Sequence, residues 1–136
     1  MEALWDGDDA RASELISDFL WETISYHNYH EDFYHAFLTG LFVGFPYSVK
    51  TDHEQGLGRT DLTIRDRKRR RAIIIEAKKA GSEAAMEKAA QEGKEQMIRK
   101  QYIRGLVGYR TILCYGIAFY QKTALVKKLD LSDEGL

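Results

Sequence analysis

The sequence has a single cysteine and no long hydrophobic run. Disulfides cannot hold the fold together, since Cys114 has no second cysteine to pair with, and a reducing cytoplasm is the compartment we expect. No apolar stretch has the length needed to cross a bilayer, and no secretory leader precedes the first predicted helix, so we expect no membrane partner. The four histidines do not combine with cysteine at a zinc-like spacing, and no ATPase-type phosphate-binding loop occurs.

An excess of charge of one sign is also missing. Twenty Lys and Arg residues balance 21 Asp and Glu residues, which leaves a net charge of −1. This balance counts against a polycation that binds nucleic acid through its overall charge. The distribution is uneven, because residues 65–71 carry six positive charges in seven positions. A solvated turn is the ordinary interpretation of such a run, but its place next to the candidate site described below gives phosphate binding equal weight.

The apolar periodicity predicts two helices in the first third of the chain. The length suits one domain over residues 1–136, of which residues 1–10 are polar, acidic and expected to be frayed. Apolar residues recur at helical spacing over residues 13–24. A second helix is predicted after Asn28, an N-cap with Glu31 as its capping-box partner, and Gly44-Pro46 should end it.

The remainder of the chain predicts strands. Alternating or continuous apolar residues indicate five of them, at residues 47–51, 60–65, 71–78, 111–120 and 124–129. The nearly continuous run at 111–120 should be central in the sheet. A helix that begins at Gly81-Ser82 and ends near Gly105 or Gly108 separates the third strand from the fourth. The predicted order is α-α-β-β-β-α-β-β, an α/β fold with a mixed sheet flanked by helices.

The strongest signal lies in the second and third predicted strands. Side chains of a strand alternate between its two faces, so burial of the apolar sets of both strands on one side fixes the parity of their pairing. The natural register places Leu62 opposite Ile75 and closes the hairpin through a short loop at residues 67–70. The same register places Asp61 directly opposite Glu76.

Two opposed carboxylates favour a metal site. They repel each other unless one is protonated or a cation lies between them. Oxygen ligands of this kind suit Mg²⁺ or Mn²⁺, and the backbone carbonyl of Ala77 is a further candidate ligand. Lys78 would present an ammonium on the same face, where it can orient a metal-bound water or bind a phosphate. The alternative is a surface hairpin with a weak, exposed Glu76–Lys78 ion pair, but Glu76 closes an Ile-Ile-Ile run and Asp61 lies on the matching face.

These residues carry a family resemblance. The chain resembles the PD-(D/E)XK nuclease superfamily, in which an Asp, then a Glu-x-Lys after an intervening hairpin, forms a Mg²⁺ site. It is more closely similar to a bacterial RecB-like domain found C-terminal to AAA-ATPase-like regions. The matching stretches are EDFYH at 31–35, GRTD at 58–61, IEAK at 75–78, QMIRKQY at 96–102 and GIAF at 116–119. The resemblance implies a restriction-endonuclease-like α-β-β-β-α-β core and Mg²⁺-dependent cleavage of phosphodiesters.

The resemblance also implies roles for individual residues. Asp61 and Glu76 match the metal ligands, and Lys78 matches the catalytic lysine. Glu31 matches an acidic position on an early helix that can lie near the metal, although a capping-box Glu is the alternative. Gln96 matches a glutamine that holds the site or the substrate, with a solvated helix face as the alternative.

Two positions depart from the family pattern. Thr60 stands where the superfamily name has proline, and Lys100 stands where the RecB-like subgroup usually has tyrosine. The first departure leaves the carboxylate of the motif in place.

We therefore expect a Mg²⁺-dependent nuclease that acts on DNA, with RNA as an open alternative. The basic run would contact backbone phosphates through Arg65, Arg67, Lys68, Arg69 and Arg70.

Two further interpretations are non-catalytic. In the first, the domain is a catalytically silent module, excised from a longer protein, that partners an ATPase domain or a second copy of itself. In the second, it is an interaction domain that uses the aromatic residues of the second helix. Such an apolar helix is more simply explained as part of the core. The aromatic residues concerned are Tyr29, Phe33, Tyr34, Phe37, Phe42 and Phe45.

Overall fold

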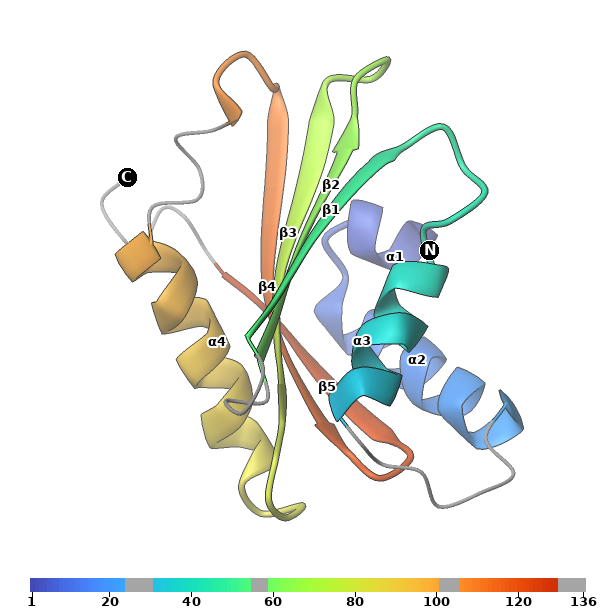
Figure 1. Cartoon of the computed structure of the whole chain (residues 1–136), viewed down its shortest axis with the longest axis vertical. Helices are drawn as coiled ribbons and strands as arrows, with labels where there is room; N and C mark the ends of the chain where they lie inside the picture. The colour runs from blue at the N-terminus through green and yellow to red at the C-terminus, as the bar shows by residue number, and fades with distance from the viewer. Residues whose placement is uncertain (24–30, 55–58, 101–105, 130–136) are drawn as a thin grey trace.

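A five-stranded mixed sheet forms the centre of the computed structural model, which describes residues 1–23, 31–54, 59–100 and 106–129 (Figure 1). The strands are β1 (Ser48–Glu54), β2 (Arg59–Asp66), β3 (Arg71–Lys79), β4 (Thr111–Tyr120) and β5 (Thr123–Lys128). The helices are α1 (Glu2–Trp5), α2 (Asp9–Thr23), α3 (Glu31–Gly40) and α4 (Met86–Lys100). The α/β class and the mixed sheet flanked by helices confirm the prediction from sequence.

The strands lie in the sheet in their chain order, β1-β2-β3-β4-β5. Only the β3–β4 pair is parallel, because α4 carries the chain back across the sheet between these two strands. The other neighbouring pairs are antiparallel. β4 was predicted to be central and is internal, but β3 occupies the central position of the five.

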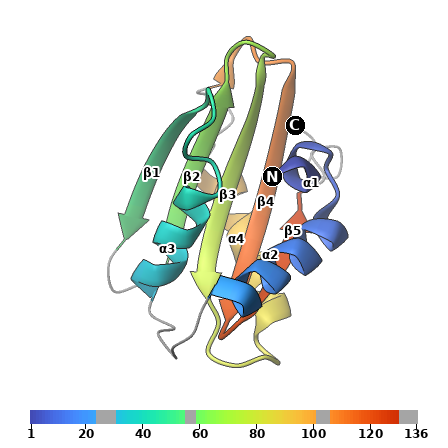
Figure 2. The ribbon, with the colours of Figure 1, turned by 90° about the vertical axis from the view of Figure 1, so that its right-hand side faces the viewer.

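Helices cover the two faces of the sheet unequally. α1, α2 and α3 lie side by side on one face, as Figure 2 shows, and the main core lies beneath them. Ile73, Ile75 and Ala77 of β3 point into this core. On the other face α4 packs on β3, β4 and β5. The alternation along β3 therefore places Glu76 and Lys78 on the face that carries α4.

The expectation that residues 1–10 are frayed was wrong. Residues 2–5 form α1, whose Ala3, Leu4 and Trp5 are buried, and α2 begins already at Asp9. The hydroxyl of Tyr115, on β4, donates a hydrogen bond to the backbone carbonyl of Leu4. The acidic composition of this segment gave no sign that Ala3, Leu4 and Trp5 reach the core.

Two predicted helix boundaries also shift. α3 ends at Gly40, before the predicted end at Gly44 and Pro46. The residues after it form a tighter turn with i→i−3 hydrogen bonds, such as the one from Phe42 N–H to Thr39 C=O. α4 begins at Met86 because the residues before it form a turn, in which Ala85 N–H donates to the Ser82 hydroxyl at 3.2 Å. Asn28 and the predicted end at Gly105 lie outside the described residues.

The aromatic residues of the second predicted helix divide between core and surface. Tyr34 and Phe42 are buried, Phe33 and Phe37 are partly buried against the core, and Phe45 is exposed. The core interpretation therefore holds for most of the described members of the set, and Tyr29 lies outside the described residues.

Cys114 is buried on the α4 side of the sheet, in the cluster that also contains Ile74 and Leu106. Burial raises the pKa of its thiol to about 12. Since the nucleophile of cysteine chemistry is the thiolate, burial makes this thiol a poor nucleophile at neutral pH.

A buried ion pair fixes the end of the β2–β3 hairpin. Asp66 is only 4% exposed and accepts a 2.8 Å bond from Arg71 Nε, while the Arg71 guanidinium lies 4.1 Å from the centroid of the Trp5 ring. The backbone N–H of Arg69 also donates to the Asp66 carboxylate. Arg71 thus belongs to the packing between the hairpin and α1, whereas its basic neighbours at 67–70 are exposed.

We expect Asp66→Asn to destabilise the protein by about 2 kcal/mol at pH 7, because Arg71 loses the negative charge of its hydrogen-bond partner. Burial raises the pKa of Asp66, but the bonds and charges of Arg71 and Arg69 outweigh it and hold that pKa below its ordinary value of 3.8. The stabilisation is therefore complete above pH 3.8 and is lost as the pH falls through the lower pKa of the folded state. Urea titrations of both proteins at pH 7, 4 and 3 should show the difference shrinking; a constant difference would contradict this account.

Candidate functional site

The β2–β3 pairing places two acidic positions directly opposite each other. Asp61 pairs with Glu76 and Leu62 pairs with Ile75, and the hairpin closes through a turn at residues 67–70. Both the register and the loop agree with the prediction from the alternation of apolar residues along the two strands. Directly opposed positions of an antiparallel pair share one face of the sheet, so positions 61 and 76 both belong to the face that carries α4.

Glu76 is a buried carboxyl residue in the middle of the sheet. It is 1% exposed, and it and Asp66 are the buried charged residues among those whose side chains the structure describes. The α4 backbone passes close by, since a Cβ built on Gly93 would lie 3.6 Å from Glu76 Cβ. A carboxylate is seldom buried unless its charge is compensated. The interpretation of Glu76 as half of an exposed surface ion pair is therefore wrong.

Lys78 does pair with a carboxylate, but with one that sequence reasoning did not find. Its Nζ lies 2.9 Å from Glu92 Oε2 on α4, and the two side chains are 30% and 33% exposed. A cavity of about 170 Å³ lies beside the pair and is also lined by Lys79 and Lys88. No local sequence pattern predicts that Glu92 contacts Lys78, because this contact depends on how α4 crosses the sheet.

The sheet extends the acidic row by one strand. Asp52 of β1 lies opposite Asp61, so Asp52, Asp61 and Glu76 occupy consecutive positions across three strands, and Gly116 of β4 follows. The sequence prediction ended the first strand at residue 51 and therefore missed Asp52. Continuation of its alternating pattern by one step is the signal that would have found it.

The remaining predicted site residues are placed through their backbones. Glu31 is the first residue of α3, which packs on the face opposite α4, and Gln96 lies in the second half of α4. Ala77 is buried in the main core between Thr60 and Ile117 of the neighbouring strands.

The side chains of several acidic candidates lie outside the described part, namely those of Glu31, Asp52 and Asp61, as does that of Gln96. Among the side chains that the structure does describe, no group of three or more His, Cys, Asp or Glu residues could hold a metal ion. The acidic row is thus defined by backbone register and by the buried position of Glu76.

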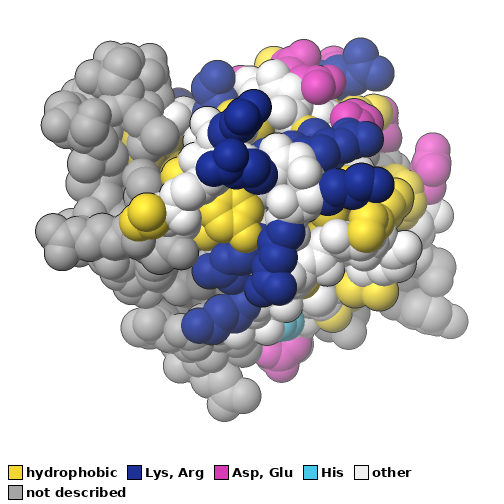
Figure 3. All heavy atoms as spheres, turned by 90° about the horizontal axis from the view of Figure 1, so that it is seen from above, with side chains coloured by type: hydrophobic (Ala, Val, Ile, Leu, Met, Phe, Trp, Pro, Cys, Tyr) yellow, Lys and Arg dark blue, Asp and Glu magenta, His cyan; other side chains and the backbone are white. Residues whose placement is uncertain are grey.

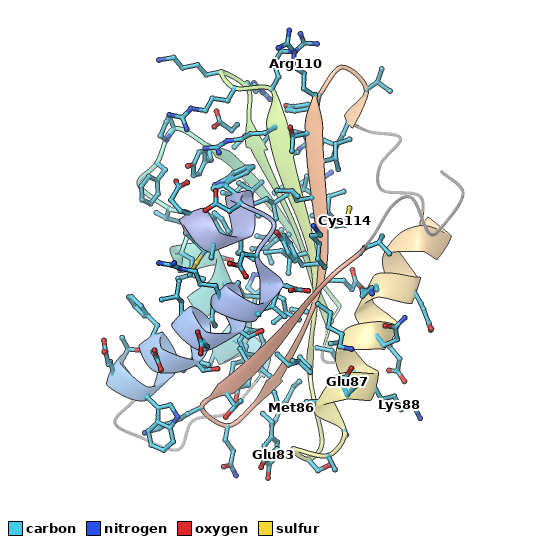
Figure 4. All side chains as sticks on the ribbon, turned by 180° about the vertical axis from the view of Figure 1, so that it is seen from behind. Glu83, Met86, Glu87, Lys88, Arg110 and Cys114 are labelled. Carbon is cyan, nitrogen blue, oxygen red and sulfur yellow. The ribbon has the colours of Figure 1, made fainter. Side chains whose placement is uncertain are left out.

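The basic residues of the β2–β3 hairpin gather at one end of the molecule. Figure 3 looks onto this end and shows the Lys and Arg side chains that surround it. The contributors from the hairpin are exposed at Arg67, Lys68, Arg69 and Arg70 and half-buried at Arg65. Arg110, which the sequence analysis did not single out, is exposed at the same end (Figure 4).

Arg70 has a structural contact within this basic end. Its backbone is left-handed, with φ of 53°, and its guanidinium donates to the Gly108 carbonyl at 2.6 and 3.1 Å. The backbone N–H of Arg110 in turn donates to the Arg70 carbonyl at 2.7 Å. These bonds fasten the hairpin turn to the segment that enters β4.

The basic end and the acidic row are neighbours in sequence but not in space. Glu76 lies five residues along β3 from Arg71, which corresponds to about 17 Å at the rise of a strand. Lys78 lies two residues further along β3, and the start of α4 lies at the end of the molecule away from Arg110 (Figure 4). A single extended ligand is needed to reach both.

Comparison with known proteins settles the family. Residues 29–129 match the family model described as PD-(D/E)XK nuclease superfamily. The chain belongs to this superfamily. No curated protein and no solved structure matches it significantly.

Membership of the PD-(D/E)XK superfamily agrees with the fold and narrows the function. The mixed five-stranded sheet flanked by helices is consistent with a restriction-endonuclease-like fold. The superfamily indicates a nuclease-type function, and its members typically use divalent metals such as Mg²⁺. In the part of the chain that is described, no helix is long and apolar enough to span a membrane.

Proposed function

We propose that this chain is a divalent-metal-dependent nuclease that hydrolyses phosphodiester bonds in DNA. One observation carries the proposal: Asp61 is in register with the buried Glu76, and Lys78 follows two residues later on the same face. The donor set fits a hard cation, because carboxylate oxygens are the ligands that Mg²⁺ and Mn²⁺ prefer. Asp61 and Glu76 would hold the metal, with the carbonyl of Ala77 as a further candidate ligand. The family resemblance also offers the carboxylate of Glu31, although α3 packs on the opposite face of the sheet.

The chemistry follows from these positions. A bound divalent cation supplies Lewis acidity toward a phosphoryl oxygen and lowers the pKa of a coordinated water. Lys78 orients the attacking water and stabilises the negative charge that develops on the phosphoryl group. Glu92 holds the Lys78 ammonium at the edge of its small cavity, and Gln96 is proposed to hold the site or the substrate. Glu76 itself is shielded from bulk water.

The basic end supplies contacts to the DNA backbone in this proposal. Consecutive phosphates of one strand are about 3.4 Å apart along the helix axis, so the separation of about 17 Å corresponds to roughly five nucleotides. Arg65, Arg67, Lys68, Arg69 and Arg70 would therefore bind phosphates some distance from the bond that is cut. Such contacts position the substrate without reading its sequence.

Removal of three exposed charges of the hairpin turn should weaken DNA binding in a salt-dependent way. We expect the combined variant Arg67→Ala, Lys68→Ala, Arg69→Ala to make the negative slope of log K against log salt shallower by up to about 2.7 units, at about 0.9 per lost phosphate contact. Arg70 is left in place because of its bonds to Gly108. Fluorescence anisotropy over a salt series measures the slope, with Arg11→Ala on α2 as the control. An unchanged slope would remove the basic end from the interface.

The proposed activity is tested by incubating the protein with single-stranded DNA, double-stranded DNA and RNA in the presence of Mg²⁺, Mn²⁺ or EDTA. The proposal predicts cleavage of DNA with either metal and none with EDTA. Cleavage that persists in EDTA would contradict the metal-dependent mechanism. The preferred substrate in this assay also decides between DNA and RNA.

One observation favours a second candidate, a catalytically silent nuclease-fold module that partners an ATPase domain. The Lys78 ammonium is engaged by Glu92, a partner that competes with a substrate phosphate. A silent module would bind DNA or a protein partner but cleave nothing with any metal. The RecB-like subtype and a cytoplasmic location belong to the proposal as well, on the sequence resemblance and the single buried cysteine.

A further inference from the structure

An apolar groove runs between α2 and α3, on the face of the sheet opposite α4. Its volume is about 810 Å³, and residues of α1 and of the segment after α3 close its sides. α2 contributes Leu15 and Phe19, α3 contributes Phe33 and Phe37, and Phe45 lies beyond the end of α3. The two helices that form the groove lie side by side in Figure 2. The groove is thus separated from Glu76 and Lys78 by the thickness of the sheet.

Aromatic contacts hold the wall of the groove in place. Phe19 of α2 meets Phe37 of α3 edge to face, with ring centroids 6.0 Å apart, and Phe33 stacks on Phe37 at 6.1 Å. Large apolar surfaces nevertheless remain in contact with solvent, since Phe19 is 49% and Phe45 52% exposed. A contiguous apolar surface of this kind marks an interaction site more often than chance exposure does.

The α3 side of the groove is open to a bulky neighbour. Ala36 and Gly40, four residues apart on α3, are exposed and line it. A Cβ built on Gly40 would meet no atom within 4 Å. Small residues at this spacing let the backbone of another helix approach closely.

The rim of the groove on α2 is acidic. Glu14, Asp18 and Glu22 are exposed and recur every four residues, so they form a row beside the lining residues Leu15 and Phe19. Glu2 adds a carboxylate to the lining itself, whereas Arg11 is the only basic residue of α2. The basic residues of the hairpin turn lie elsewhere, at the end of the molecule that Figure 3 displays.

We propose that this groove binds a basic amphipathic helix of a partner protein. An amphipathic helix inserts its apolar face into such a groove through residues spaced at i, i+3, i+4 and i+7, and Lys or Arg on its flanks would pair with the acidic rim of α2. A second copy of this chain is the weaker occupant, because a face-to-face dimer would bring two such acidic rims together. Anionic membranes and nucleic acids are repelled by the same charges. The site is independent of the proposed nuclease centre on the other face.

The test uses the full chain and a fluorescein-labelled peptide of about 18 residues, or five helical turns, with leucine on one face and lysine on the other. A second peptide with glutamate in place of lysine is the charge control. Fluorescence anisotropy should show binding of the basic peptide at least about tenfold tighter than that of the acidic one, and the difference should shrink in high salt.

Two kinds of variant locate the binding. Phe19→Ala and, separately, the triple variant Glu14→Gln, Asp18→Gln, Glu22→Gln should each weaken binding of the basic peptide about tenfold. Trp21→Ala is the matched control, since Trp21 is 65% exposed on the same helix but does not line the groove, and it should bind within about twofold of wild type. Circular dichroism checks that each variant is folded.

Several outcomes would overturn the proposal. They are absence of binding, equal binding of the two peptides, and unchanged binding in Phe19→Ala. Sedimentation that shows a dimer broken by Phe19→Ala would assign the groove to a second copy instead. Binding to phosphatidylserine vesicles that requires Phe19 would assign it to a membrane. None of these readouts depends on cleavage of DNA.

Discussion

Lys78→Ala should reduce DNA cleavage by about 100-fold or more while the protein remains folded. Loss of one group that stabilises developing charge typically costs this much in rate. The side chain is 30% exposed and makes an ion pair of a kind that adds little stability, so its removal should change the free energy of unfolding by less than about 1 kcal/mol. Initial cleavage rates in Mg²⁺, with thermal melts of both proteins, measure the two quantities.

Two companion variants sharpen this result. Lys78→Arg should not restore activity, because a planar guanidinium does not replace a compact ammonium in position. Lys128→Ala removes an exposed strand lysine on β5 and should cleave at the wild-type rate. Wild-type cleavage by Lys78→Ala would rule out the catalytic assignment of Lys78, whatever the metal requirement proves to be.

Gly116→Ala should destabilise the protein by about 3 kcal/mol, which corresponds to a fall of roughly 10 °C in Tm. A Cβ at this position would lie 2.1 Å from the carbonyl oxygen of Ala90 and 3.0 Å from the backbone nitrogen of Lys94. Both atoms belong to the backbone of α4, so the helix itself has to move. Because α4 also carries Glu92, the variant should lose cleavage activity even below its Tm.

The matched control is Gly81→Ala. A Cβ on Gly81 meets nothing within 4 Å, and its backbone is not left-handed, so we expect a change of less than about 0.5 kcal/mol. Chemical denaturation of both variants separates a specific clash from a general effect of losing a glycine. Equal stability of Gly116→Ala and wild type would mean that α4 does not lie as close to β4 as the structure places it.

The hairpin could be predicted from the sequence because its physics is local. Alternation along each strand and burial of one apolar face determine the register, and the loop between the two strands is short. The Asp61–Glu76 pairing could therefore be predicted from the residues of the hairpin alone. The strands and the helix between the third and the fourth followed from periodicity in the same way. The family motif, Asp61 followed by Glu76-x-Lys78, lies within this hairpin.

Contacts between distant segments could not be predicted. α1 is apolar at three positions only, and its burial depends on Tyr115, more than 100 residues later in the chain. The Lys78–Glu92 pair likewise requires the path of α4 across the sheet, where the backbones meet closely at Gly93 and Gly116. Asp52 was missed for a simpler reason, since the predicted first strand stopped one residue short of it.

The central claim is that Asp61 and Glu76 share a divalent cation, and metal-dependent thermal stabilisation tests it most directly. Mg²⁺ or Mn²⁺ at about 100 times its Kd should stabilise the wild-type protein by about 2.7 kcal/mol, and EDTA should reverse the shift. Asp61→Asn should lose this stabilisation but be at least as stable as wild type without metal, because the repulsion with Glu76 is relieved. A shift of equal size in both proteins, or none in the wild type, would contradict the claim.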